Sequence, residues 1–271
     1  MKCIKKILVA VSSIGTATLF AVAVKNISLQ KDVKLPDGFT VTAHTGCEKT
    51  KDNSLDAITL GFGYGADVVE FDLSFNEEGI AVLSHDKPVG GEVTLEEAFE
   101  LISQYKNLKV NVDVKFTDDL AQVVAAAGKY GISDRYFFTG VTKDTVEAVK
   151  AAAPGVTYYL NTEIDKSRIE DEQYIAELIE EVKSVGGVGL NIHYRSCSKK
   201  MVDAFHDQGL LMSVWTVNQV RDMPKALALE CDNITTRYPS KLIPMVEFIR
   251  KNLTICQPPT PNLGGCRCFL L

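Results

Sequence analysis

The chain has no excess of basic residues: 29 Lys and Arg stand against 35 Asp and Glu, for a formal net charge of −6 at pH 7. Nucleic-acid-binding surfaces need clustered positive charge to neutralise phosphates, so this composition argues against nucleic acid as a partner. No Gly-x-Gly-x-x-Gly turn follows a candidate strand, which weakens a dinucleotide-binding interpretation. No internal repeat or mid-chain linker is present either. About 230 residues remain between the two ends, which suits one αβ domain or two small ones.

The seven cysteines lack the spacing of a metal clip. Cys266 and Cys268 are two apart, but no second pair has ligand spacing, so we interpret them as cysteines of a tail. Cys47, Cys197 and Cys231 are far apart in the sequence. In an exported protein some of these could form disulfides, and the sequence does not say which.

The two ends differ in composition from the middle of the chain. Residues 1–6 are basic, residues 7–24 carry no charge, and Ala21-Val22-Ala23 has the small-x-small form of a signal-peptidase site. We therefore expect residues 1–24 to be a signal peptide or an N-terminal membrane anchor. The protein would then be secreted, periplasmic or at the cell surface, and membrane attachment through residues 7–24 stays open. Proline and glycine density predicts a disordered tail over residues 253–271, which leaves a domain over residues 36–251.

Strand-like and helix-like segments alternate along the domain. The expected strands are Phe39–His44, Asp67–Leu73, Leu108–Val114, Tyr136–Thr139, Val156–Leu160, Val188–Ile192, Leu210–Trp215 and Asp232–Thr236, with a short extra strand at Ile80–Ser84. Helical spacing of apolar residues predicts helices at Asn53–Leu60, Leu95–Ile102, Leu120–Lys129, Thr142–Ala152, Ile169–Val185, Lys199–His206 and Val220–Leu229. Eight strands with intervening helices indicate an α/β fold, a single (β/α)₈ TIM barrel with a short extra strand after the second. A doubly wound open sheet is the rival.

Two carboxylates define the strongest candidate site. Glu70 and Asp72 are two apart in a strand, so both side chains point to the same face, while Val69, Phe71 and Leu73 point to the other. Buried like charges repel each other unless something positive lies between them. A divalent cation with oxygen ligands is the natural occupant.

Other polar residues also follow the ends of the expected strands, where barrel active sites are built. These are His44, Asp113, Lys115, His193, Trp215 and Arg237. A plain Asp113–Lys115 salt bridge remains an alternative to a functional role, and Trp215 could be a packing residue. Asn218 could merely cap a helix. We interpret His206 as a surface residue, and Tyr194, Arg195 and Tyr238 as candidate rim residues.

Seven motifs follow one another through the domain: His44-Thr45-Gly46, Asp52-Asn53-Ser54-Leu55, Gly65 to Asp72, His85-Asp86, Val112-Asp113-Val114-Lys115, Val214 to Asn218, and Asp232 to Pro239. In this order they resemble the motifs of the glycerophosphodiester phosphodiesterase family, within the phosphatidylinositol-phospholipase-C-like barrels. The family's patterns are His-Arg-Gly, Glu-Asn-Thr-Leu, Gly-Ala-Asp-x-x-Glu-x-Asp, His-Asp, Ile-Glu-Ile-Lys, Trp-Thr-Val-Asn and Asp-Gly-Ile-Ile-Thr-Asp-Tyr-Pro. The order and the span make the resemblance specific.

The resemblance implies an enzyme, a phosphoric diester hydrolase that cleaves glycerophosphodiesters to glycerol 3-phosphate and an alcohol. It implies His44 and His85 as general acid and base, and Glu70, Asp72 and Asp113 as ligands of Ca²⁺ or Mg²⁺. Lys115 would contact the phosphate, with Asp52 and Trp215 also in the substrate site. The expected partner is a small glycerophosphodiester or lipid-derived molecule.

Three departures from the family's motifs qualify this prediction. The arginine of His-Arg-Gly is Thr45, and two glutamates are the shorter Asp52 and Asp113. In a closed barrel the last strand lies beside the first, so Arg237 could reach the gap left at Thr45. The departures also suggest a catalytically impaired barrel that only binds a phosphate-bearing ligand. A third hypothesis is a membrane-anchored phospholipase that acts on intact phospholipid.

Overall fold

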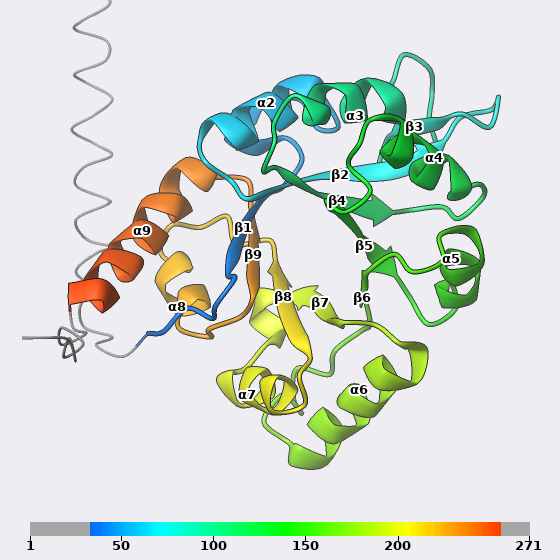
Figure 1. Ribbon diagram of the computed structural model, residues 1–271. Coiled ribbons are helices and arrows are strands. Elements are labelled where there is room, and N and C mark those ends of the chain that lie inside the picture. The colour runs from blue at the N-terminus through cyan, green and yellow to red at the C-terminus, as the bar shows by residue number, and fades with distance from the viewer. Residues whose placement is uncertain (1–32, 256–271) are drawn as a thin grey trace, which may run out of the picture.

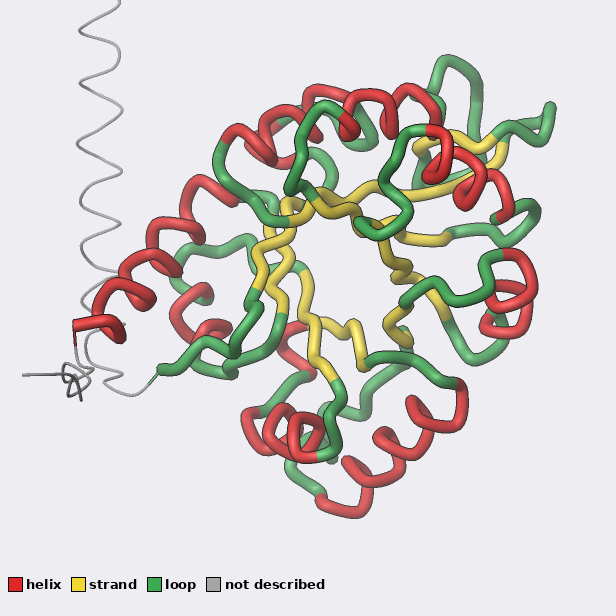
Figure 2. Tube along the Cα trace, in the orientation of Figure 1, coloured by secondary structure: helices red, strands yellow, loops and turns green. Residues whose placement is uncertain are grey.

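The computed structural model describes residues 33–255, which fold into a closed parallel barrel surrounded by helices (Figures 1 and 2). The strands follow the order β1-β9-β8-β7-β6-β5-β4-β2, and the pairing of β1 with β2 closes the ring. All of these neighbours pair in parallel. The predicted TIM barrel is therefore confirmed, and the open sheet is excluded because its first and last strands would not meet.

The eight barrel strands lie close to the predicted segments. They are β1 (Thr40–Ala43), β2 (Val68–Phe75), β4 (Lys109–Val114), β5 (Tyr136–Val141), β6 (Tyr158–Leu160), β7 (Gly189–His193), β8 (Leu211–Trp215) and β9 (Asn233–Thr236). The expected extra strand is β3 (Ala81–Leu83), which pairs antiparallel with β2 outside the barrel.

Helices form the outer layer and two short 3₁₀ turns follow strands at the barrel's end. The helices are α2 (Leu55–Gly63), α3 (Leu95–Ser103), α4 (Ala121–Lys129), α5 (Val146–Ala152), α6 (Glu172–Val185), α7 (Lys199–Asp207), α8 (Met223–Leu227) and α9 (Pro239–Ile255), and the turns are η1 (Cys47–Lys49) and η2 (Tyr194–Ser196). A capping box of Thr94 and Glu97 starts α3. Helix α6 begins later than predicted because the Asp171 side chain caps its N-terminus.

Helix α9 was missing from the predicted elements. Its buried residues Leu242, Met245, Val246 and Ile249 have the spacing of one helical face, so the signal was present in the sequence. The helix also corrects the expected tail boundary, since residues 253–255 continue α9. The proline density behind the tail prediction begins only at Pro258.

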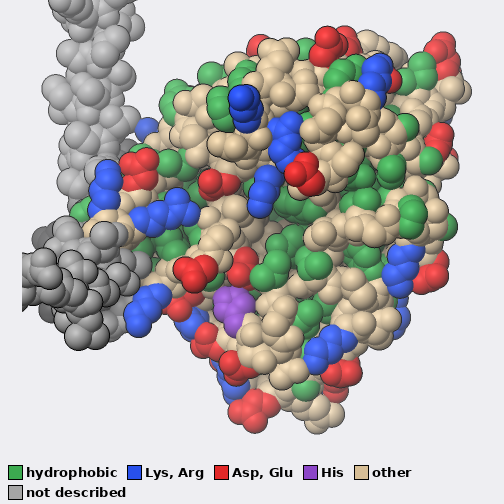
Figure 3. Space-filling model, in the orientation of Figure 1, with side chains coloured by type: hydrophobic (Ala, Val, Ile, Leu, Met, Phe, Trp, Pro, Cys, Tyr) green, Lys and Arg blue, Asp and Glu red, His purple; other side chains and the backbone are tan. Residues whose placement is uncertain are grey.

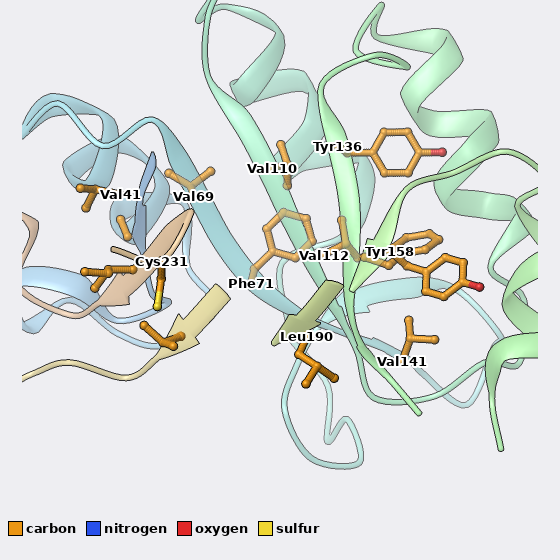
Figure 4. Packing of buried hydrophobic residues seen from close by; sticks show 14 of the residues in the cluster. Val41, Val69, Phe71, Val110, Val112, Tyr136, Val141, Tyr158, Leu190 and Cys231 are labelled. Carbon is orange, nitrogen blue, oxygen red and sulfur yellow. The ribbon is translucent and has the colours of Figure 1, made fainter. Parts of the chain in front are cut away.

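The apolar core lies between the strands and the helices, while the barrel interior is polar. Val69, Phe71 and Val110 pack in the apolar cluster (Figure 4). The alternate positions carry buried polar side chains that are linked across neighbouring strands. Thr42 Oγ1 donates to Asn233 Oδ1 at 2.7 Å, and Asn233 Nδ2 donates to Ser213 Oγ at 3.0 Å. The inward positions near the strand ends can therefore offer polar side chains to a hydrophilic site.

On the face shown in Figure 3, acidic and basic side chains are interspersed. Within residues 33–255, no helix combines the length and apolar character needed to cross a bilayer. The predicted N-terminal segment of residues 1–24 and the tail from residue 256 lie outside the described residues.

Candidate active site

All nine residues predicted for the site line one cavity of about 350 Å³ at the carboxyl ends of the strands. We call it the rim cavity. Its lining is His44, Asp52, Glu70, Asp72, His85, Asn111, Asp113, Lys115, Thr139, Gly140, Asn161, Asn191, Trp215, Thr216, Thr235 and Arg237. Segments nearly two hundred residues apart thus contribute to one site, because the barrel brings all strand ends to one rim.

Three carboxylates form a cluster in the rim cavity, with Glu70 and Asp72 buried and Asp113 partly buried. Glu70 and Asp72 extend from β2, and Asp113 lies opposite Asp72 in the register of β4. One oxygen from each carboxylate lies within 4.8 Å of the others. Two oxygens on opposite sides of one Ca²⁺ ion lie about 4.6 to 5.2 Å apart, at twice the usual ligand distance. The cluster therefore has the size and the donor type of a divalent cation site.

The charge around this cluster is only partly compensated. Lys115 Nζ lies 3.0 Å from Asp72 Oδ1 and 2.5 Å from Asp113 Oδ2. Burial alone would lower the pKa of Lys115, but the two carboxylates outweigh it and raise that pKa. Burial, followed by repulsion from Asp72 and Asp113, raises the pKa of Glu70 well above its usual range. When all three carboxylates are ionised, one lysine leaves two negative charges, which matches a divalent ion.

The loop between β1 and α2 holds the carboxylates in place. The Thr45 N–H donates to Glu70 Oε2 at 2.7 Å. Asn53 Nδ2 donates to Asp72 Oδ2 at 2.9 Å, and Asn53 Oδ1 accepts from the Asp72 N–H at 3.0 Å. Asn53 is a supporting residue that the sequence reasoning missed, although it lies inside one of the seven motifs.

The Thr45 side chain faces this loop and not the rim cavity. Its hydroxyl accepts from the Asn53 N–H and donates to Asn53 Oδ1, and only 2% of the residue is exposed. Thr45 is absent from the lining of the rim cavity. The threonine at this position therefore does not replace the family's arginine on a substrate.

The two predicted histidines enter the rim cavity from different surroundings. His44 Nδ1 lies 2.9 Å from the Thr45 carbonyl oxygen, which can only accept, so a neutral His44 ring carries its proton on Nδ1. Burial is the main reason that the pKa of His44 is lowered from 6.5. Its Nε2 then carries the lone pair that can accept a proton. His85 lies beyond β3 with 66% of its side chain exposed, and its Nδ1 is 2.9 Å from Asp86 Oδ1.

Arg237 reaches the rim cavity from the end of β9. Its Nη1 donates to Asp52 Oδ1 at 2.5 Å and its Nη2 to Asp52 Oδ2 at 3.2 Å. The Asp52 carboxylate, as hydrogen-bond partner, raises the pKa of Arg237, and Arg237 in turn contributes to lowering that of His44. Gly46 makes room for this pair, since a Cβ there would collide with both side chains. The guanidinium therefore lies near His44, as barrel closure predicts.

The opposite wall of the rim cavity is neutral. It contains side chains that sequence reasoning did not single out as site residues, from β5 to β9: Thr139, Asn161, Asn191, Thr216 and Thr235. Asn161 Oδ1 accepts from the Gly140 N–H at 3.0 Å, and Trp215 Nε1 donates to the Asn191 carbonyl at 3.3 Å. The sequence does hold a signal for these neutral residues, which is a polar residue between apolar neighbours in a strand. Leu190-Asn191-Ile192 is an example.

Several residues with weaker sequence signals do not line the rim cavity. Tyr194 and Arg195, suggested as rim residues, both bond to Asp222. Asn218 Oδ1 accepts from the Arg237 N–H at 2.8 Å, so it supports the loop that carries the arginine. His206 is partly buried and pairs with Asp232 at 2.9 Å. Tyr238 is half-buried and is also outside the lining.

Residues 92–241, more than half of the 271-residue chain, match the Glycerophosphoryl diester phosphodiesterase family. This chain belongs to that family. A glycerophosphodiester phosphodiesterase of Caldanaerobacter subterraneus subsp. tengcongensis is 23% identical over 245 residues, which cover 76% of this chain and 97% of that protein. The chain is thus identified as a glycerophosphodiester phosphodiesterase-like phosphoric diester hydrolase.

Solved structures of this type share the fold. A glycerophosphodiester phosphodiesterase from Parabacteroides distasonis superposes with a TM-score of 0.59 at 19% identity, covering 79% of this chain and 98% of its own. A phosphodiesterase from Oleispira antarctica, solved with its product sn-glycerol-3-phosphate, has a TM-score of 0.64 at 21% identity, with 79% and 97% covered. At these identities the likeness concerns the barrel, and the residues of the rim cavity carry the argument about chemistry.

Proposed function

We propose that this glycerophosphodiester phosphodiesterase family member hydrolyses glycerophosphodiesters to glycerol 3-phosphate and an alcohol. It would do so with a divalent metal and two histidines. The observation that carries the proposal is the single rim cavity, which holds two imidazoles, three clustered carboxylates and two cationic side chains. Hydrolysis of a phosphodiester needs a proton acceptor, a proton donor and compensation of phosphoryl charge. The product bound to the Oleispira relative is of the proposed kind.

Glu70, Asp72 and Asp113 are the residues that would hold Ca²⁺ or Mg²⁺. When bound, such an ion would neutralise charge that develops on the phosphoryl oxygens. The size of the cluster and its two uncompensated charges support this assignment. Lys115, already in contact with two of these carboxylates, would bind a phosphate oxygen from the same side.

His44 is the proposed general base and His85 the proposed general acid. The Thr45 carbonyl fixes the tautomer of His44, so its Nε2 can take a proton from the nucleophile. His85 would then protonate the departing alcohol. The nucleophile is either water or a hydroxyl of the substrate's own glycerol, and the second route passes through a cyclic phosphate.

Arg237 is the proposed phosphate-binding arginine in place of the one missing at Thr45. It is the cation closest to Asp52, and it reaches the rim cavity from the strand adjacent to β1. A phosphate oxygen could take over one of the two hydrogen bonds that Asp52 accepts. Asp52 would thus hold the guanidinium in position before the substrate arrives.

A barrel that binds a phosphate-bearing ligand without turnover is the second candidate. The departures at Thr45, Asp52 and Asp113 suggest it, because they alter three positions of the family's motifs. The presence of both histidines in the rim cavity argues for turnover, since binding alone requires no proton-transfer pair.

We also propose that the protein acts outside the cytoplasm. The basic residues 1–6 and the uncharged residues 7–24 support export. Fractionation of cells that express the full chain, compared with a chain lacking residues 1–24, tests this proposal. Equal distribution of the two forms would contradict it.

The decisive experiment on function is metal depletion and add-back with a panel of glycerophosphodiesters, followed by ³¹P nuclear magnetic resonance. We expect glycerol 3-phosphate to form only after Ca²⁺ or Mg²⁺ is restored, and a transient cyclic phosphate if the substrate hydroxyl attacks. Full activity of a verified metal-free sample would contradict the metal site. No turnover of any diester with either ion would favour the binding candidate.

A further inference from the structure

Two buried cysteines face each other away from the rim cavity. Cys197 Sγ and Cys231 Sγ are 4.0 Å apart, and both residues carry free thiols. Cys197 follows η2 and is 7% exposed, whereas Cys231 shortly precedes β9 and is fully buried within the core (Figure 4). Neither residue lines the rim cavity. The barrel therefore places together two thiols that are 34 residues apart in sequence.

We propose that Cys197 and Cys231 form a disulfide that closes the last part of the barrel. A disulfide needs its sulfur atoms about 2.05 Å apart, and the thiols already approach within twice that distance. Side-chain torsions at both residues would have to supply the remaining movement of about 2 Å. The sequence left the pairing of Cys47, Cys197 and Cys231 open, and the geometry selects one pair among them.

Cys47, the third cysteine of the described residues, has a different environment. Its thiol donates to the Ala57 carbonyl oxygen at 3.2 Å, and burial raises its pKa to about 11. The hydrogen bond with Cys197 and burial raise the pKa of Cys231 as well, so the proximity of a second thiol, and not acidity, distinguishes the proposed pair from Cys47. Cys47 therefore provides a matched control, because it is buried and free but lies elsewhere in the barrel.

The oxidation needs an external disulfide, such as a protein dithiol oxidase or oxidised glutathione. Cys197 is the first nucleophile, because it lines a separate cavity of about 250 Å³ between η2 and α8, which gives a reagent access. Its thiolate attacks the reagent's disulfide, forms a mixed disulfide and releases one thiol. Cys231 then loses its proton and attacks Cys197 Sγ, which releases the second thiol. Two S–H bonds break, one S–S bond forms, and two electrons and two protons reduce the reagent.

The loop that this bond would close carries a wall of the catalytic site. It includes α7, β8 and α8, and β8 ends at Trp215. Asn218, which holds the Arg237 backbone, lies in the same loop. A cross-link at its ends reduces the conformations open to the unfolded chain and so stabilises this segment. Exported proteins meet the required oxidants, which agrees with the predicted export of this chain.

The test is peptide mapping of the full chain by mass spectrometry under non-reducing conditions. Samples are treated with oxidised glutathione both in the native state and during refolding from the reduced, unfolded state. We expect a linked peptide pair containing Cys197 and Cys231, two hydrogens lighter than the separate peptides. If both residues remain alkylatable in both treatments, or pair with Cys3, Cys256, Cys266 or Cys268 instead, the proposal is overturned.

Thermal unfolding provides a second measurement. The oxidised protein should unfold roughly 5 to 15 °C above the reduced protein, as expected for a cross-link of this loop length. Cys47→Ser should keep this difference, whereas Cys197→Ser and Cys231→Ser should each abolish it. Mapping of the wild-type chain decides the matter if either variant fails to fold. Because neither cysteine lines the rim cavity, oxidised and reduced samples should hydrolyse substrate at equal rates below both transitions.

Discussion

At the scale of single residues, the guanidinium in the rim cavity comes from Arg237 and not from position 45, where the family's motif has arginine. Thr45 is buried and supports Asn53, while the guanidinium of Arg237 lies in the rim cavity on Asp52. The sequence predicted that Arg237 would approach the site, because barrel closure makes β9 a neighbour of β1. It did not predict the pairing with Asp52, since two loops define that contact together.

Replacement of Arg237 tests its proposed contact with phosphate. Arg237→Ala should lower kcat/KM by about 1–3 kcal/mol of transition-state stabilisation, the scale of a hydrogen bond to a charged group. Steady-state kinetics on a glycerophosphodiester measures this change. Arg195→Ala is the matched control, because Arg195 also pairs with an aspartate after a strand but lies outside the rim cavity. Equal kinetics in the two variants would remove Arg237 from substrate binding.

Replacement of His44 and of His85 tests their proposed roles in proton transfer. His44→Ala and His85→Ala should each reduce turnover by roughly 10²- to 10⁴-fold, the usual contribution of a general acid or base. The control is His206→Ala, since His206 also pairs with an aspartate but is not in the rim cavity. Circular dichroism should show intact folds in all three proteins. A near-wild-type rate in either cavity variant would exclude that histidine from proton transfer.

The pH dependence follows from the burial of His44. A general base works in its neutral form, and burial lowers the pKa of His44 from 6.5. The apparent pKa of the acidic limb of kcat/KM should therefore lie below 6.5. Activity is lost as the pH decreases through this lowered pKa. A bound cation would repel the imidazolium and shift the limb in the same direction. A limb at or above pH 6.5 in a pH–rate profile would contradict His44 as the base.

At the scale of elements, strand alternation was the most informative signal. It predicted that Glu70 and Asp72 share one face of β2, and the register places Asp113 beside Asp72. Helix ends were harder to predict, because caps such as Asp171 depend on side-chain hydrogen bonds. Helix α9 was not predicted, and it contains Pro244, a residue type that usually interrupts helices.

The loop between β1 and α2 could not be derived from periodicity, and it has a testable role. Asn53 has φ 54°, a left-handed conformation that Asn and Gly tolerate. Asn53→Gly keeps this backbone but removes both side-chain bonds to Asp72. We expect this positioning change to weaken divalent-cation affinity by about 1–3 kcal/mol, measured by isothermal titration calorimetry.

The conservative variant distinguishes positioning from general damage to the fold. Asn53→Asp keeps an oxygen to accept from the Asp72 N–H but adds a charge that repels the Asp72 carboxylate. Gly38→Asn provides the control in a separate loop, since Gly38 also has positive φ and a Cβ added there would meet no atom within 4 Å. If cation affinity is unchanged in Asn53→Gly, the loop does not position Asp72.

At the scale of the whole molecule, closure of the barrel explains why so much of the site was predictable. Most motifs specify a strand end or the loop beyond it, and the common rim brings all nine predicted residues into one cavity. The neutral wall of Asn161 and Asn191 was not predicted, because neither residue lies in a motif and only the three-dimensional fold places them opposite the carboxylates. Motif order therefore predicts the charged half of the site better than the neutral half.

The carboxylate cluster couples the stability of the molecule to metal binding. In metal-free protein the pKa of Glu70 is raised, so its contribution to stability is largest below its unfolded pKa and is lost as pH rises through the raised value. A divalent cation that binds only the folded state adds about 2.7 kcal/mol when present at a hundredfold excess over its Kd. The melting temperature should then rise by roughly 5–10 °C at pH 7.5.

Glu70→Gln tests this coupling directly. Without metal the variant should be as stable as the wild type or more stable, because it removes one of three repelling carboxylates while a Gln oxygen can still accept from the Thr45 N–H. With saturating Ca²⁺ or Mg²⁺ its melting temperature should hardly change, whereas Glu147→Gln, at an exposed surface pair, should keep the wild-type response. Differential scanning calorimetry at several cation concentrations measures both effects. A cation response of wild-type size in Glu70→Gln would mean that the ion binds elsewhere, and the proposed metal site would be wrong.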